Sequence, residues 1–427
     1  MKKKHSLNEK KVWGPIIVFL GSLFYFYEYF LRVSPSVIEH QLEGYFGLTA
    51  KTFGTLSAFY FYAYTPIQLI VGIAVDKLKM RHILVTAIFC CALGTVIIPM
   101  SHDLWVAALG RFLQGFGSAF AFVGVLKLAS VWLPEDRFAT FSGFAASLGF
   151  IGAAVGEILL NGFVEFVGWK TALFIFGGFG FLLSFVAYLT MKAHPTPSSR
   201  DVVKGRQLKN LLKSLKDVMK VKQIWFSGVI SFLMFLPTSV FASLWGIPYL
   251  KELHNYTDSQ ASLAVSMIFV GWAIGSPLNG YISDKLHRRM KIIGFGALLA
   301  FMLSVVILYV QNIPYLLLIP ILIIFGIVSS TQVLTFAIAT ELSPHKAAGT
   351  AVAFTNTLAM LGGFIFQRAV GEMLEMNWDH KFIHGQPVYS ISNFQHALAI
   401  IPICLFLAAV LGFILRDKKT RKKHLTL

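Results

Sequence analysis

Twelve separate runs of about twenty apolar residues follow one another along the chain, and they constrain its fold more than any other feature. A helix of that length crosses the roughly 30 Å hydrocarbon core of a bilayer. Little sequence remains between the runs for a soluble domain. The sequence therefore predicts an all-α membrane protein with twelve transmembrane helices. The predicted spans lie near residues 13–36, 52–76, 83–100, 104–132, 138–164, 169–191, 224–250, 260–283, 291–310, 314–340, 348–374 and 395–415.

The distribution of charge predicts how these spans are oriented. Only 13% of the residues are charged, against about a quarter in soluble proteins, yet the formal net charge is +17. Of the 37 Lys and Arg residues, 29 fall on one side of the membrane, which predicts that both termini are cytoplasmic. The same bias indicates anionic lipid headgroups, and not nucleic acid, as the partner of the positive charge. The segments on this side are 1–12, 77–82, 133–137, 192–223, 284–290, 341–347 and 416–427, with the adjoining Lys291.

Cysteine and histidine usage predicts no metal and no cofactor. Cys90, Cys91 and Cys404 all fall within predicted spans, so no disulfide framework is expected. No pair of histidines has the spacing of metal ligands. The first apolar segment is too long for a cleavable signal peptide and is interpreted as the first span.

One long cytoplasmic connection, residues 192–223, divides the chain into two halves. We expect a bundle of six helices in 1–191 and a second one in 224–427. Within the connection, residues 207–219 place leucines on one helical face and lysines on much of the other. This pattern predicts an amphipathic helix on the membrane surface, acting either as a simple tether or as a lipid-sensing element.

The two halves carry the same motif, 208 residues apart. A glycine, three further residues, an aspartate and a lysine end both the second and the eighth predicted spans, and arginine follows. The glycine lets a neighbouring helix approach closely, and the aspartate can face a helix N-terminus or a cation. Two six-span repeats around a central site are the architecture of many secondary transporters. The gating residues predicted from this repeat are Gly72, Asp76, Arg81, Gly280, Asp284 and Arg288.

The repeated motif resembles the signature loop of the major facilitator superfamily. The stretch from Arg111 to Gly115, Arg-Phe-Leu-Gln-Gly, resembles the superfamily's fourth-helix motif. The resemblance covers the whole chain and implies the major facilitator fold, transport by alternating access and a link between Arg111 and proton transfer. Residues 149–157 carry the glycines of the family's antiporter signature without its proline, which weakens the case for drug/proton exchange.

A narrower resemblance rests on residues 26–35, Phe-Tyr-Glu-Tyr-Phe-Leu-Arg-Val-Ser-Pro, and on residues 59–66, Phe-Tyr-Phe-Tyr-Ala-Tyr-Thr-Pro. Both segments resemble the phagosomal transporter family of intracellular bacterial pathogens. This resemblance implies amino-acid uptake, with nucleosides as the substrates of some members.

The first span carries the sharpest candidate site. Tyr25, Glu28, Tyr29 and Arg32 are spaced so that they share one helical face. Glu28 precedes Arg32 by one turn, which is the favourable order for an ion pair. Ionisable residues inside a membrane are costly and usually functional, so we expect the pair to face an aqueous cavity between the halves. Arg32 would bind a substrate carboxylate and release Glu28 to take up a proton; a purely structural pair is the alternative.

Other spans supply tyrosine, tryptophan and amide side chains for the wall of such a site. For each of these residues, packing in the core is the alternative interpretation. Pairing of Arg111 with Glu157, or of either residue with Arg32 or Glu28, remains open. The substrate-binding candidates are Arg32, Tyr25, Tyr29, Tyr60, Tyr64, Gln332, Asn356 and Trp245, and the proton-coupling candidates are Glu28, Arg111 and Glu157.

These features predict a proton-coupled symporter that takes up a small polar solute, with an amino acid as the favoured substrate. The sequence lacks an ATP-binding Gly-Lys-Ser/Thr loop, so a gradient must supply the energy. Organic anions, nucleosides or an iron-chelating carboxylate are alternative substrates. A membrane enzyme or a sensor is a remote alternative, because the sequence shows neither a catalytic constellation nor a signalling domain. We expect a monomer in the bacterial inner membrane.

Overall fold

The computed structural model of the chain describes residues 7–133, 135–193, 206–343, 347–376, 378–383 and 386–415. Helices account for most of these residues, which confirms the predicted all-α class. The first half contains α1 (Leu7–Val37), α2 (Glu39–Phe46), α3 (Ala50–Lys77), α4 (Met80–Met100), α5 (Leu104–Ser118), α6 (Ala121–Trp132), α7 (Glu135–Val167) and α8 (Trp169–Ala193).

The rest of the chain adds ten α-helices, two helical segments of other types and a short antiparallel hairpin of β1 (Phe382–Ile383) and β2 (Gln386–Pro387). The segments are a π-helix, η1 (Pro237–Trp245), and a 3₁₀-helix, η2 (Ser330–Val333). The α-helices are α9 (Arg206–Met219), α10 (Lys222–Leu236), α11 (Gly246–His254), α12 (Asp258–Leu286), α13 (Arg289–Tyr309), α14 (Tyr315–Ser329), α15 (Leu334–Leu342), α16 (Ala348–Met376), α17 (Ile391–Leu398) and α18 (Ile400–Ile414).

The predicted spans coincide with helical segments. Eleven segments in the described part of the chain are long and apolar enough to cross a membrane, and the 28-residue α3 takes the place of the second span. Four spans are built from consecutive pieces that continue one another. These are α5 with α6, α10 with η1 and α11, α14 with η2 and α15, and α17 with α18.

Polar side chains at loop boundaries define where several of the helices begin. Asp103 caps α5, because its Oδ1 accepts hydrogen bonds from the backbone N–H groups of Trp105 and Val106 at 2.8 and 3.2 Å. Thr257 and Ser390 form capping boxes at the starts of α12 and α17. Such caps satisfy backbone donors that the first helical turn leaves unpaired.

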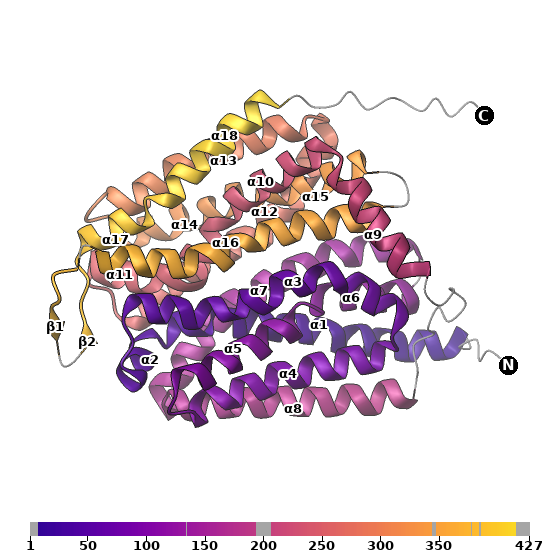
Figure 1. The fold of residues 1–427 in the computed structure, drawn as a ribbon, viewed down its shortest axis with the longest axis horizontal. Helices are drawn as coiled ribbons and strands as arrows, with labels where there is room; N and C mark the ends of the chain where they lie inside the picture. Colours follow the sequence, from indigo (N-terminus) through magenta and orange to yellow (C-terminus); the bar gives the residue numbers. More distant parts are fainter. Residues whose placement is uncertain are drawn as a thin grey trace.

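The helices of the first half lie together on one side of the molecule, and those of the second half lie on the other (Figure 1). The halves meet along two seams, in which α3 packs against α16 and α7 packs against α12. The predicted domain limits, 1–191, 192–223 and 224–427, stay a prediction. Helix α9 is present where the amphipathic helix was expected, and its last turn packs on the second half, with Val218 buried against Ile224 and Ala351.

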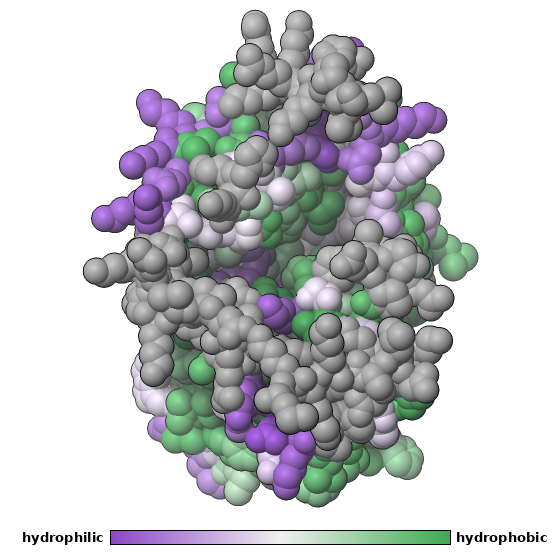
Figure 2. Space-filling model, turned by 90° about the vertical axis from the view of Figure 1, so that its right-hand side faces the viewer, coloured by the Kyte–Doolittle hydropathy of each residue, from purple (hydrophilic) through white to green (hydrophobic). Residues whose placement is uncertain are grey.

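We call the end at which α1 begins and α18 ends the proximal end, and the end with α2, α11 and the hairpin the distal end (Figure 1). Figure 2 views the proximal end and shows a hollow between the two halves. The positive-inside prediction makes the proximal end cytoplasmic, and this orientation stays a prediction.

At the distal end the seam between α3 and α16 is closed by direct backbone contact. A Cβ atom built on Gly371 would lie 2.3 Å from the carbonyl oxygen of Ala50, and one built on Gly54 would lie 2.4 Å from that of Gln367. The Ala50 N–H also donates to Tyr389 Oη at 2.9 Å. Glycine therefore permits the two halves to touch at this end, while the proximal end is hollowed.

Candidate functional site

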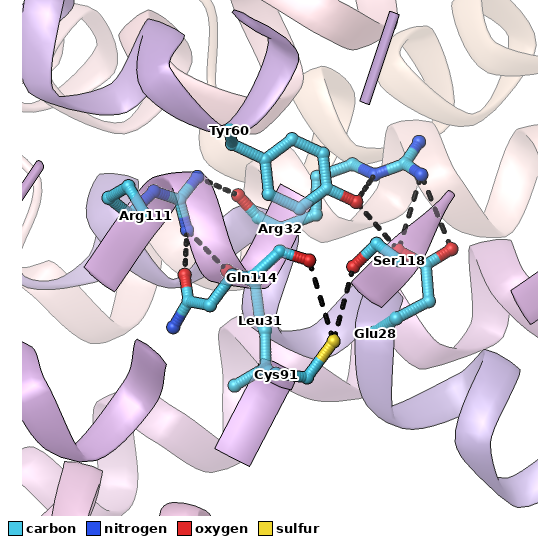
Figure 3. A network of polar contacts seen from close by, with 8 residues as sticks. All are labelled: Glu28, Leu31, Arg32, Tyr60, Cys91, Arg111, Gln114 and Ser118. Carbon is cyan, nitrogen blue, oxygen red and sulfur yellow. Dashed lines mark hydrogen bonds and ion pairs between the residues drawn. The ribbon is translucent and has the colours of Figure 1, made fainter. Parts of the chain in front are cut away.

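The Glu28 carboxylate, the Arg32 guanidinium and the Tyr60 hydroxyl form a closed triangle of hydrogen bonds (Figure 3). Arg32 Nη2 donates to both carboxylate oxygens of Glu28 at 3.3 Å, and Arg32 Nε donates to Tyr60 Oη at 3.1 Å. Tyr60 Oη in turn donates to Glu28 Oε2 at 2.8 Å. Helix α1 therefore carries the expected pair, and Tyr60 on α3 completes it.

Arg111 on α5 holds the backbone of α1 immediately beside this triangle (Figure 3). Its Nη1 donates to the carbonyl of Leu31 at 2.9 Å and to Gln114 Oε1 at 2.7 Å, and its Nη2 donates to the carbonyl of Arg32 at 3.4 Å. Gln114 Nε2 then donates to Thr95 Oγ1 at 2.9 Å. Arg111 thus fixes the position of the turn that carries Arg32.

Aromatic rings cover the charged pair in this state. Glu28 is fully buried and Arg32 is 5% exposed. The guanidinium carbon of Arg32 lies 4.0 Å from the ring centroid of Tyr29 and 5.3 Å from that of Tyr64, which are cation–π distances. The expectation that the pair faces an open aqueous cavity is therefore wrong for this state. A solute can reach Arg32 only if these rings move.

The cluster carries more positive than negative charge and has unused donors. It contains two guanidinium groups, those of Arg32 and Arg111, and one carboxylate, that of Glu28, which leaves one formal positive charge. Arg32 Nη1 and Arg111 Nε are buried donors without a hydrogen-bond partner in the described part of the chain. Buried donors are normally paired, so an unpaired charged donor indicates a place for an acceptor that arrives from outside.

The other predicted substrate-binding residues divide into two groups. Tyr25 and Asn356 belong to the group at the cluster: Tyr25 packs edge-on against Tyr29 at 5.2 Å between ring centroids, and Asn356 lies near Tyr64. Trp245 and Gln332 are engaged elsewhere. Trp245 donates its Nε1–H to the carbonyl of Gln367 at 3.1 Å in the distal seam, and Gln332 donates to Ser231.

Glu157 stands apart from the cluster. It is fully buried on α7, and neither carboxylate oxygen has a hydrogen-bond partner in the residues that the structure describes. The open possibility of a pair between Glu157 and Arg111 is therefore not realised, because Arg111 is bonded to the backbone of α1 and to Gln114. A coupling role for Glu157 stays a prediction.

Sequence reasoning missed an aromatic chain that connects the cluster to the second half. Tyr29 contacts Phe150 at 5.4 Å, Phe150 stacks on Trp272 at 4.8 Å, and Trp272 contacts Phe235 at 5.7 Å. Phe150 and Trp272 lie on α7 and α12, across the second seam. Trp272 is conspicuous in the sequence, but its pairing with Phe150 depends on the packing of two helices that are distant along the chain.

The structure describes the ion pairs of the gating motif in its second copy, at the turn between α12 and α13. Arg289, and not the predicted Arg288, donates from Nη2 to Asp284 at 2.9 Å and from Nε to Glu341 at 2.9 Å. Arg288 is exposed. In the first copy, positions 72 and 76 lie outside the residues whose side chains are described, and Arg81 stacks on Tyr188 at 5.3 Å. Gly280 has no atom within 4 Å of a built Cβ, so the expected close helix approach is absent there.

We expect Arg289→Gln to slow transport without weakening substrate binding. The bridge joins the α12–α13 turn to α15 at the proximal end, far from the Arg32 cluster. Partly exposed pairs of this kind contribute about 0.2–1 kcal/mol each, so we expect turnover to fall roughly fivefold. Turnover in vesicles and binding to the purified protein measure the two effects. Arg288→Gln is the matched control, and a loss of affinity in Arg289→Gln would contradict the gating role.

The chain is similar along most of its length to transport proteins and a sensor protein of bacteria. It is 22% identical to a probable sulfoacetate transporter of Cupriavidus necator over 62% of this chain and 64% of that protein. It is 22% identical to a probable hexose phosphate transport protein of Chlamydia muridarum over 88% of each chain. It is also 23% identical to a membrane sensor protein of Salmonella typhimurium over 93% of each chain.

Solved structures and the family model agree on the architecture. The crystal structure of a bacterial homologue of the human lysosomal transporter Spinster, in an inward-facing and unoccupied conformation, superposes with a TM-score of 0.76 at 15% identity. The match covers 96% of this chain and 100% of that one. The model of the Major Facilitator Superfamily matches residues 18–367. The chain therefore belongs to the major facilitator superfamily and is a multi-pass membrane transporter.

Proposed function

We propose that this transporter carries a small organic anion, such as a carboxylate, sulfonate or phosphate ester, and that Arg32 binds the anionic group. The observation that carries the proposal is the unpartnered Nη1 of a buried guanidinium in a cluster with one excess positive charge. Charge-assisted hydrogen bonds from arginine to planar or tetrahedral oxyanions are strong and geometrically specific. Two of the relatives are named for the transport of sulfoacetate and of hexose phosphate, which are anions of this class.

Proton coupling would follow from competition for Arg32. Glu28 and an incoming anion both require the same guanidinium, so binding of the anion weakens the bond between Glu28 and Arg32. The Glu28 carboxyl then keeps only the Tyr60 hydroxyl as its partner and takes up a proton, because an uncompensated charge in this dry site is costly. This exchange supports proton symport, and the uptake direction remains part of the proposal.

An amino acid is the second candidate substrate. The Glu28 carboxylate and the Arg32 guanidinium lie beside each other, and such a pair could hold the ammonium and carboxylate groups of one zwitterion. The relatives described above lend this candidate no support, since the substrates that they name are anions. The narrower resemblance to phagosomal amino-acid transporters is likewise unsupported by these relatives.

The proposal is tested by binding to the purified protein, followed by transport. Sulfoacetate, a hexose 6-phosphate, glycerol 3-phosphate and a panel of neutral amino acids are added at pH 5.5 and 7.5, and the shift in melting temperature is measured. The compound that binds is then tested for accumulation in proteoliposomes with and without an inwardly directed proton gradient. We expect an anion to stabilise the protein and a proton gradient to drive its accumulation.

Three outcomes decide between the candidates. Stabilisation by amino acids alone would replace the anion with the second candidate. Binding of an anion without transport under any gradient would favour a sensor, since one relative is named a membrane sensor protein. Binding of an anion that survives in the doubly neutral variant Glu28→Gln/Arg32→Gln would overturn the assignment of Arg32. Arg288→Gln, which changes an exposed arginine far from the cluster, serves as the control.

A further inference from the structure

One carboxyl group is buried without a partner in the middle of the fifth span. Glu157 lies at the midpoint of the membrane-spanning part of α7, Ser147–Val167, about 15 Å along the axis from either end. Its side chain is fully buried, and neither of its carboxyl oxygens has a hydrogen-bond partner among the residues that the structure describes. Because buried polar groups are normally paired, this carboxyl group requires an explanation.

The side chains and backbone around Glu157 are apolar. A Cβ atom built on the preceding Gly156 would lie 3.0 Å from the Cα atom of Phe30 on α1. Phe150, two turns before Glu157 on the same helical face, stacks on Trp272 of α12, so this face of α7 is turned to the second half. The helices packed against α7 are α1, α6, α8 and α12, and no charged or titratable side chain of their described residues interacts with the Glu157 carboxyl group.

A proton is the ligand that fits this carboxyl group. An ionised carboxylate without a partner is costly in an apolar environment, and such a group takes up a proton instead. Hard metal cations require several oxygen ligands. Within the described ranges, no three acidic, histidine or cysteine side chains are grouped so that they could hold a metal ion. The buried Glu157 carboxyl group is therefore neutral in this state and carries a proton.

A stripe of polar side chains leads from Glu157 towards the distal end. Asn161 and Glu165 follow at intervals of four residues, each about 6 Å further along the helix axis. Asn161 is 5% exposed and donates from Nδ2 to Glu165 Oε1 at 2.8 Å, and Glu165 is exposed. Trp169, just beyond α7, contacts Tyr45 of α2, so this end of the stripe is distal. In the opposite direction, residues 149–156 are all glycine or apolar, and α7 offers no polar path there.

We infer that Glu157 is a proton-binding site, separate from Glu28, that exchanges its proton with the distal solution along Asn161 and Glu165. The Asn161 amide can hold a water molecule that passes the proton between the two carboxyl groups. Separation of α7 from α12 would let water reach Glu157 and would remove the cost of its ionisation, because its face of α7 is turned to the second half. The inference does not depend on which solute is carried.

The experiment is infrared spectroscopy of the full-length protein in nanodiscs, without added solute. A protonated carboxyl group absorbs at a higher frequency than a carboxylate, and its band shifts when deuterium replaces the proton. Spectra are recorded at pH 7.5, where solvated glutamates, with a pKa of about 4.3, are ionised. The band of Glu157 is the difference between the parent and Glu157→Gln, which keeps the shape of the neutral side chain. Glu157→Leu supplies the same difference if the glutamine variant does not fold.

We expect a protonated carboxyl band that is lost in Glu157→Gln and kept in Asp379→Asn, which removes an exposed distal carboxyl group. After transfer to heavy water, this band should shift roughly tenfold more slowly in Asn161→Leu than in the parent, the factor that corresponds to one lost hydrogen bond in the relay. Asn161→Gln keeps the amide and should exchange at nearly the parent rate.

Two results would overturn the inference. The absence of a protonated band that depends on Glu157 would show that the site holds no proton. An unchanged exchange rate in Asn161→Leu would show that the proton does not travel along the distal stripe. Since the assay contains no solute, neither result bears on whether the transported substrate is an anion.

Discussion

Arg32→Gln is expected to abolish measurable binding of the anionic substrate and, at the same time, to destabilise the protein. Loss of a buried charged contact to a ligand costs about 2–5 kcal/mol, which corresponds to a roughly 30-fold or greater loss of affinity. The same substitution leaves Glu28 fully buried without its cation, and breaking a buried pair costs about 3–5 kcal/mol of stability. Isothermal titration and thermal unfolding measure the two effects on the same preparation.

A second substitution separates these two effects. In Glu28→Gln/Arg32→Gln both charges are removed, so the penalty for an unpaired charge disappears and most of the stability should return. Binding should not return, because no guanidinium is present to receive the anion. If the double variant recovers binding together with stability, Arg32 is a structural residue only. Arg32→Lys adds a graded test, since lysine keeps the charge but lacks the planar donor set that serves Glu28, Tyr60 and the substrate together.

Gly371→Leu is expected to hold the distal end open and to stop transport while leaving the fold intact. A Cβ atom at this position would lie 2.3 Å from the carbonyl oxygen of Ala50, which is backbone and cannot turn away. The seam can relieve this overlap by separating α3 from α16, because the contact lies between the two halves. We therefore expect rapid maleimide labelling at Phe53→Cys, which is buried beside Trp245 in the same seam, together with loss of turnover.

Two other glycines test whether position, and not bulk alone, causes this effect. Gly178 has no atom within 4 Å of a built Cβ, so Gly178→Leu should leave both labelling and transport near the parent level. A Cβ atom built on Gly115 of α5 would lie 1.9 Å from the carbonyl oxygen of Tyr60, and this contact lies inside the first half. This contact cannot be relieved by separating the halves, and Gly115→Leu should lower the melting temperature. Slow labelling in Gly371→Leu would contradict the account of the seam.

Periodicity along single helices made much of this architecture predictable. The runs of apolar residues set the number and limits of the spans, and the spacing of Glu28 and Arg32 placed them together because both lie on one helix. Contacts between helices were harder to foresee. Tyr60 as the third member of the triangle, and Arg111 as a clamp on the α1 backbone, depend on which faces of α1, α3 and α5 meet.

Local backbone geometry explains another difference between expectation and structure. Arg288 and Arg289 are adjacent, and the sequence alone gives no reason to prefer one as the partner of Asp284. His287 adopts a left-handed conformation with φ of 52°, and this turn leads into α13 with Arg289, not Arg288, beside Asp284. Trp245 was likewise assigned to the substrate wall from its residue type, whereas its indole N–H is bonded to the α16 backbone in the distal seam.

The π-helical turn in the seventh span makes the distal end sensitive to a screw motion. Segment η1, Pro237–Trp245, is wound more widely than an α-helix, so it holds more residues in each turn. Tightening it to α-helical winding would rotate α11 against α10 by about 100° for every residue of register gained. Tyr249, whose hydroxyl donates to the carbonyl of Leu308, would swing away from that partner, and Lys251 would leave its salt-bridge partner Asp258 at the start of α12. A change of helical winding within the span would therefore alter the contacts that charged and polar residues of α11 make at the distal end.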